Sequence, residues 1–176
     1  IIDGEERVNV FNRIYRENGE YRDKLVGNFL WHPGKGHHHY HYSDFADYTF
    51  ESLNSASGGP TRKEKTSFCV LDEMKVNLSL PGSPKIAKFP KCFKDRQGLS
   101  VGWGDDYEYD LAGQNFDITD FAPGVYRLMF EVNPRNRFVE SRADKNKSFA
   151  IVRLDPPNKK FEVIATAAAF EGSSSF

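Results

Sequence analysis

Apolar and polar residues alternate with a period of two along much of the chain, the pattern of β-strands with one buried face. Residues 126–132 and 150–154 alternate in this way, and residues 66–71 form a compact apolar run between polar neighbours. An early alternating segment leads into Asn18-Gly19, for which we predict a type I′ hairpin turn followed by a return strand over 21–31.

The connections between these segments are long and turn-rich. Residues 52–62 and 77–90 are polar or proline-rich, and no capped helix or internal repeat is visible. Many short strands joined in this way are typical of a sandwich. We therefore predict an all-β fold, a β-sandwich with long functional loops and little helix.

The length of the chain, 176 residues, suits one domain with a core of its own. We expect residues 1–176 to be a single catalytic domain whose Ala- and Ser-rich C-terminal end is frayed. The chain starts with Ile1-Ile2-Asp3, without Met or signal peptide, so we interpret it as a mature or trimmed fragment.

Charge and hydropathy exclude two classes of partner. The chain has 24 Lys and Arg against 25 Asp and Glu, a net charge of −1, which argues against nucleic-acid binding through bulk electrostatics. The longest apolar stretch, residues 164–170, is too short to cross a bilayer. We expect neither a nucleic-acid partner nor a membrane span.

All five histidines lie between His32 and His41. Side chains at i, i+2 and i+4 of a strand share a face, which would bring His37, His39 and His41 together. In a flat strand the outer Cα atoms would be about 13 Å apart, so binding one ion requires a bend, which the turn at 33–36 could supply. Imidazole suits copper and zinc, and the spacing alone does not decide the metal.

Four stretches, in order, resemble segments of the lysyl oxidase family. They are similar to its copper-binding segment, its lysine-bearing strand, the bacterial-type version of its tyrosine-bearing loop and its closing strands, at residues 26–48, 65–71, 97–114 and 117–141. The likeness covers most of residues 7–154. One such motif would be weak, but four in the family's order are specific.

The resemblance implies a copper(II) site and a cofactor made from the chain itself. His37, His39 and His41 would be the copper ligands. Lys65 and Tyr107 would be the two precursors of lysine tyrosylquinone.

The resemblance also implies roles for an acid and two cysteines. Asp105 would be the base that removes the substrate α-proton, and its acidic surroundings at 105–110 would concentrate cationic amines. Cys69 and Cys92 match a disulfide pair of the family. A disulfide implies an oxidising compartment, so we expect an extracellular or cell-envelope location.

Some positions depart from the family pattern. The turn between Trp31 and His37 is longer than in the animal enzymes, and most of their other cysteines are missing. The animal enzymes hold calcium in an acidic, Asn-rich turn. Glu140 and Asn146 fit this turn, but Arg142 and Lys145 replace ligands, which argues against calcium. We also expect an N-terminal strand of the family to be truncated.

The first hypothesis is a copper- and quinone-dependent amine oxidase. It would act with O₂ on the lysine side chains of a protein or on small primary amines, releasing an aldehyde, ammonia and hydrogen peroxide. The alternatives are a non-catalytic copper-binding or adhesive β-sandwich and another His-ligated metal enzyme, such as a small oxygenase. The presence of both Lys65 and Tyr107 favours the oxidase over the binding module.

Overall fold

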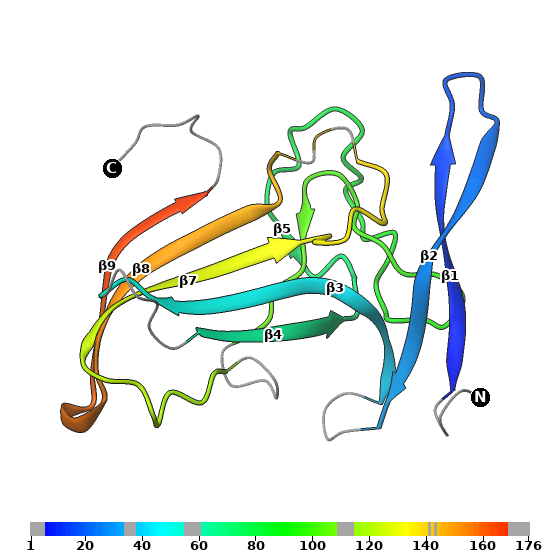
Figure 1. The fold of residues 1–176 in the computed structure, drawn as a ribbon. Helices are drawn as coiled ribbons and strands as arrows, with labels where there is room; N and C mark the ends of the chain where they lie inside the picture. The colour runs from blue at the N-terminus through cyan, green and yellow to red at the C-terminus, as the bar shows by residue number, and fades with distance from the viewer. Residues whose placement is uncertain are drawn as a thin grey trace. The chain divides into compact units, whose positions relative to one another are not determined.

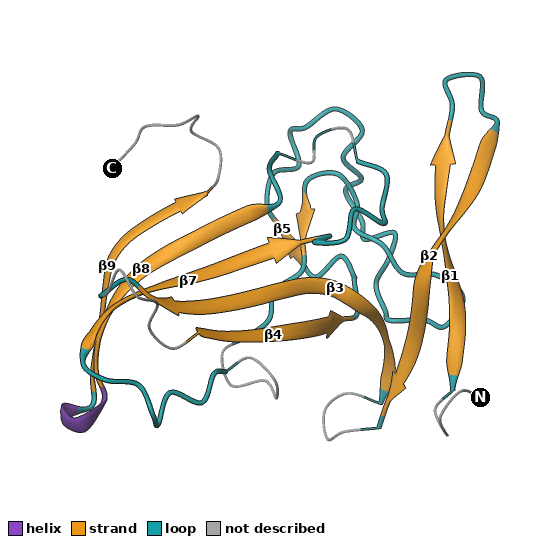
Figure 2. Cartoon of the chain, viewed as in Figure 1, coloured by secondary structure: helices purple, strands orange, loops and turns teal. Residues whose placement is uncertain are grey.

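The computed structural model describes residues 6–33, 38–54, 61–108, 115–140, 142 and 144–168, with the side chains of 62–66 and 168 outside this part. In chain order the elements are β1 (Arg7–Tyr15), β2 (Tyr21–His32), β3 (His39–Ser52), β4 (Thr61–Phe68), β5 (Met74–Lys75), β6 (Trp103–Gly104), β7 (Gly124–Val132), β8 (Lys147–Asp155), η1 (Pro156–Asn158) and β9 (Lys160–Ala168) (Figure 1). Among the described residues the only helical element is the single turn η1 (Figure 2). The predicted all-β fold with little helix is confirmed.

The chain divides into two compact units. The first contains Ile1–Ser43 and Ser67–Gln114, and the second contains Asp44–Thr66 and Asn115–Phe176. The strands β3 and β4 each start in one unit and end in the other.

In the first unit, β1 and β2 form an antiparallel hairpin that ends in the pair Tyr15–Tyr21. The predicted type I′ turn is wrong. Arg16 pairs with Glu20 across a three-residue loop, in which Gly19 alone has a positive φ, +83°. A type I′ turn needs positive φ at both central residues, whereas a three-residue loop needs it only at its last position, which glycine fills here.

The start of β3 pairs with β2 in a register that joins His32 to His39 and Trp31 to Tyr40. A two-stranded ribbon, β5 with β6, completes the regular structure described in this unit. Few backbone hydrogen bonds of the β-sheet type stabilise the long segment between β5 and β6. Its conformation therefore depends on side-chain contacts.

Asp72 holds that segment. Its buried carboxylate accepts hydrogen bonds from the backbone N–H groups of Lys88, Phe89 and Ser100 and from the Ser100 hydroxyl, at 2.6–3.2 Å. Burial alone would raise the pKa of Asp72, but these hydrogen bonds outweigh it and lower the pKa below its ordinary value. The charged carboxylate therefore fixes two separate points of the loop, residues 88–89 and Ser100.

In the second unit, the rest of β3 pairs with β7, followed by β8 and β9, all antiparallel. The alternating positions of β7 and β8 point to one core, as their period of two predicts. The buried core residues are Phe50, Phe121, Tyr126, Val152 and Leu154. Phe50 stacks on Tyr126 with ring centroids 5.2 Å apart.

Leu154→Ala is expected to lower the free energy of unfolding by about 3 kcal/mol, because the side chain is 2% exposed and its removal leaves a cavity. Urea denaturation measures the change. Phe161 lies opposite Leu154 in the β8–β9 register and is 63% exposed, so Phe161→Ala is the control, with a loss below about 1 kcal/mol. Equal losses in the two variants would contradict this assignment of the core.

Candidate active site

Two of the predicted metal ligands converge at the start of β3. The rings of His39 and His41 lie on one face of the strand with centroids 4.8 Å apart, and their Nε2 atoms are 2.9 Å apart. Two nitrogens that share one ion at about 2.0 Å lie about 2.8–3.3 Å from each other in square-planar or tetrahedral geometry. The spacing of this pair therefore fits a shared metal ion.

The third predicted ligand, His37, lies outside the described residues. The backbone changes direction next to it: His38 has φ +32°, in the left-handed region, and β3 begins only at His39. The strand that carries His39 and His41 therefore does not extend through His38.

Two further side chains orient His41, which is 4% exposed. The Ser67 hydroxyl lies 3.3 Å from its Nδ1 atom, and the His32 ring stacks on it with centroids 4.9 Å apart. Metal-binding histidines usually engage their second ring nitrogen in this way, which fixes ring orientation and tautomer. Sequence reasoning did not assign a role to His32 or Ser67. The hairpin register was the only signal available for His32, and nothing local marks Ser67.

Tyr107 lies against the end of β4. Its hydroxyl donates a hydrogen bond to the backbone carbonyl of Cys69 at 2.6 Å, and its ring meets the edge of Phe68 with centroids 4.3 Å apart. Burial raises the pKa of Tyr107 well above its ordinary value, and the nearby charge of Asp105 raises it further. The side chain is thus held as a neutral phenol in a fixed position.

Lys65 belongs to β4, three residues before Phe68, and its side chain lies outside the described part of the structure. The described contacts therefore place His39 next to His41. They also place Tyr107 next to the end of β4.

Asp105 lies beside the same segment. Its carboxylate accepts a hydrogen bond from the Leu71 N–H at 3.2 Å. Burial raises the pKa of Asp105 to about 6 in spite of that bond, and the charges of Glu73 and Asp106 add to the increase. A carboxyl group that titrates near neutral pH is suited to accept and return a proton.

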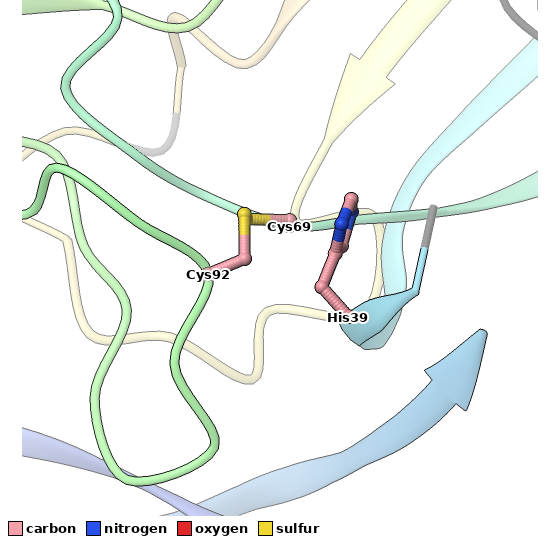
Figure 3. Close-up of side chains that lie close together, drawn as sticks. All are labelled: His39, Cys69 and Cys92. Atoms are coloured by element: carbon pink, nitrogen blue, oxygen red, sulfur yellow. A yellow bond between two sulfur atoms is a disulfide. The ribbon is translucent and has the colours of Figure 1, made fainter. Parts of the chain in front are cut away.

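The disulfide implied by the family resemblance is present. Cys69 and Cys92 are bonded, with Cα atoms 5.6 Å apart, and the bond ties the end of β4 to the long loop. Figure 3 shows the His39 imidazole next to this disulfide.

Glu140 and Asn146, which correspond to the calcium-binding turn of the animal enzymes, are not arranged as a cation site. One carboxylate oxygen of Glu140 accepts hydrogen bonds from the side-chain amides of Asn133 and Asn146, at 2.5 and 2.8 Å. Arg142 forms an ion pair with Asp144. A calcium site needs oxygen ligands, whereas these described residues supply amide N–H donors and a guanidinium group. They therefore do not fit calcium.

Among the described residues, no helix is long and apolar enough to pass through a membrane.

Comparisons with known proteins identify the family. The sequence profile described as lysyl oxidase matches residues 15–162. The chain is 32% identical over 147 residues to lysyl oxidase homolog 2 of Xenopus tropicalis, covering 81% of this chain and 18% of that protein. It is 34% identical over 120 residues to lysyl oxidase homolog 3B of Danio rerio, covering 68% of this chain and 14% of that protein. The chain thus spans less than a fifth of these relatives, and it belongs to the lysyl oxidase family.

Proposed function

We propose that this chain is a copper-dependent amine oxidase. It takes primary amines, including the lysine side chains of proteins, and converts them with O₂ into aldehydes, ammonia and hydrogen peroxide. The observation that carries the proposal is the 2.9 Å approach of the His39 and His41 Nε2 atoms in a chain of the lysyl oxidase family.

His37, His39 and His41 would hold copper(II). When bound, copper supplies with O₂ the oxidising capacity that turns Tyr107 into a quinone. The chain's own contribution is to orient the ligands, because Ser67 and His32 restrain the His41 ring on two sides. Pre-oriented ligands bind an ion without a large ordering cost.

Lys65 and Tyr107 would form the lysine tyrosylquinone, which supplies an electrophilic centre for the substrate amine and accepts its two electrons. The hydrogen bond to the Cys69 carbonyl and the contact with Phe68 restrict rotation of the Tyr107 ring. The strand that carries Lys65 is the one whose end packs on this ring, and this supports their pairing.

Asp105 would take the α-proton of the substrate onto its carboxylate. Its raised pKa, about 6, makes it a stronger base than an exposed aspartate while leaving it ionised at neutral pH. Asp106, Glu108 and Glu73 add negative charge around it, and this charge would attract an ammonium group.

The disulfide supports an extracellular or cell-envelope location, since such bonds persist in oxidising compartments. A non-catalytic copper-binding or adhesive module of the same fold would share the histidines and the disulfide. The two functions differ in whether Lys65 and Tyr107 become joined.

Peptide mass spectrometry of copper-loaded, aerated protein is expected to find the Lys65 and Tyr107 peptides covalently joined. Lys65→Ala and Tyr107→Phe should each abolish peroxide release while copper stays bound, because neither residue is a ligand. His39→Ala should lose both copper and peroxide release. Copper-loaded protein with both peptides unmodified would instead support the binding module.

The kcat/KM of the oxidase is expected to fall as the pH drops through about 6, because protonated Asp105 can no longer accept the α-proton. Asp105→Asn should lower kcat by about 10²-fold or more. Initial rates of peroxide release across this pH range measure both effects. A flat profile in the wild-type chain would exclude Asp105 as the base.

The same variant separates a proton-transfer role from a structural one. The pKa of Asp105 is raised in the folded state, from 3.8 to about 6, so its charge destabilises the fold increasingly as pH rises through this window. Because the group is partly exposed, Asp105→Asn should stabilise the fold by only about 1 kcal/mol at neutral pH, with no gain below about pH 4.

The KM for a diamine should rise with ionic strength, because salt screens the attraction between the acidic surroundings of Tyr107 and the cationic substrate. A monoamine of the same length carries one charge fewer, so its KM should rise less. Steady-state kinetics over a series of salt concentrations tests this. A KM that does not respond to salt would rule out electrostatic attraction of the substrate.

A further inference from the structure

The two cysteines and His39 form a cluster whose sulfur atoms take no part in the proposed oxidase chemistry. A ring nitrogen of His39 and the sulfur atoms of Cys69 and Cys92 all lie within 4.8 Å of one another. Figure 3 shows the imidazole facing the disulfide from the start of β3. The sulfur atoms are bonded to each other, so the cluster holds no thiolate ligand in its oxidised form.

The three side chains are near enough to one another to reach a common zinc ion once the sulfur atoms separate. Zinc binds thiolate sulfur at about 2.3 Å and imidazole nitrogen at about 2.0 Å, so in a tetrahedron two sulfurs are about 3.8 Å apart and sulfur and nitrogen about 3.5 Å apart. Both distances are shorter than 4.8 Å, the limit within which the three ligand atoms of the cluster lie from one another. With the Cα atoms of the cysteines 5.6 Å apart, rotation of their side chains would suffice to separate the sulfurs.

We propose that reduction of the Cys69–Cys92 disulfide creates a zinc(II) site formed by both thiolates and His39. A dithiol reductant gives up two electrons and two protons and becomes a disulfide, while the Cys69–Cys92 bond breaks and two thiols form. Zinc then displaces the two thiol protons to solvent. An oxidant of the disulfide class reverses the electron transfer and releases the ion.

The surroundings of the cluster favour a soft metal ion. Cys69 is buried at 1% exposure, whereas Cys92 and His39 are half-buried, so an ion can reach the cluster without unfolding it. Two thiolates and an imidazole select zinc or copper(I) over calcium and magnesium, and three protein ligands leave a fourth position for water.

The zinc site and the imidazole site share His39. If the copper site of the proposed function is correct, the two sites exclude each other, and disulfide formation frees His39 for copper. Only this consequence rests on the proposed function. The thiolate site itself depends on the three clustered side chains alone.

Cobalt(II), which adopts zinc geometry and absorbs light when bound to thiolate, is the probe. The full chain is reduced with dithiothreitol, desalted without oxygen and titrated with cobalt. We expect a thiolate-to-cobalt charge-transfer band that saturates at one ion per chain and disappears when zinc is added. The oxidised chain and reduced Cys92→Ser should not give this band.

His39→Ala and His38→Ala form a matched pair, because His38 is an exposed imidazole next to His39. We expect His39→Ala to weaken cobalt binding at least tenfold and His38→Ala to change it less than twofold. Equal affinities in the two variants would overturn the proposal, since they would mean that the thiols bind cobalt without the imidazole.

Two other results would also overturn it: a reduced chain without the charge-transfer band, and a reduced chain whose circular dichroism has lost the β-sheet signal. The quinone proposal is tested independently, by cross-linked peptides in the oxidised, copper-loaded chain. Either proposal can therefore fail while the other stands.

Discussion

The short segment from Ser67 to Leu71, which contains the end of β4, is the constraint on which the candidate site depends. Cys69 is bonded to Cys92, and its carbonyl accepts the Tyr107 hydroxyl. Leu71 donates its N–H to Asp105, and Ser67 reaches the ring of His41. Ligand orientation, tyrosine position and acid environment are therefore all set by one stretch of backbone. A shift of this stretch would therefore disturb all three together. The loss of a single contact elsewhere would not have this effect.

Two carboxylates next to this segment show how hydrogen bonding separates structural from chemical roles. Burial removes water from both carboxylates. Four hydrogen bonds replace that water at Asp72, so the pKa of Asp72 falls and the charged group anchors the long loop. Asp105 accepts a hydrogen bond from the Leu71 N–H, which does not offset its burial and its negative neighbours, so its pKa rises to about 6. The balance of donors, rather than burial alone, suits one acid to hold structure and the other to exchange protons.

His39 lies close to two groups that can serve as metal ligands. Its Nε2 atom is 2.9 Å from that of His41, and one of its ring nitrogens lies within 4.8 Å of the sulfur atoms of the Cys69–Cys92 disulfide. Sulfur atoms that are bonded to each other offer no thiolate to a metal ion. If both proposed sites are correct, the state of the disulfide therefore decides which of them includes His39.

Much of the fold was predictable because the relevant interactions are local in the chain. The period of two in 126–132 and 150–154 identifies strands whose inward positions include Tyr126 and Leu154, both in the core. The same periodicity predicts that His39 and His41 share a face. The hairpin turn was placed in the right segment, but its type was wrong. Asn18-Gly19 chemistry allows more than one loop length, and strand pairing between Arg16 and Glu20 selects among them.

The remaining features depend on contacts between residues far apart in sequence. No local pattern indicates that Ser67 meets His41, that His32 stacks on the same ring or that Asp72 binds two separate points of a loop. The residue types of the site could be named from the sequence because family motifs carry them. Their burial, pKa values and mutual distances could not, since these arise only when separate strands pack and exclude water from the groups between them.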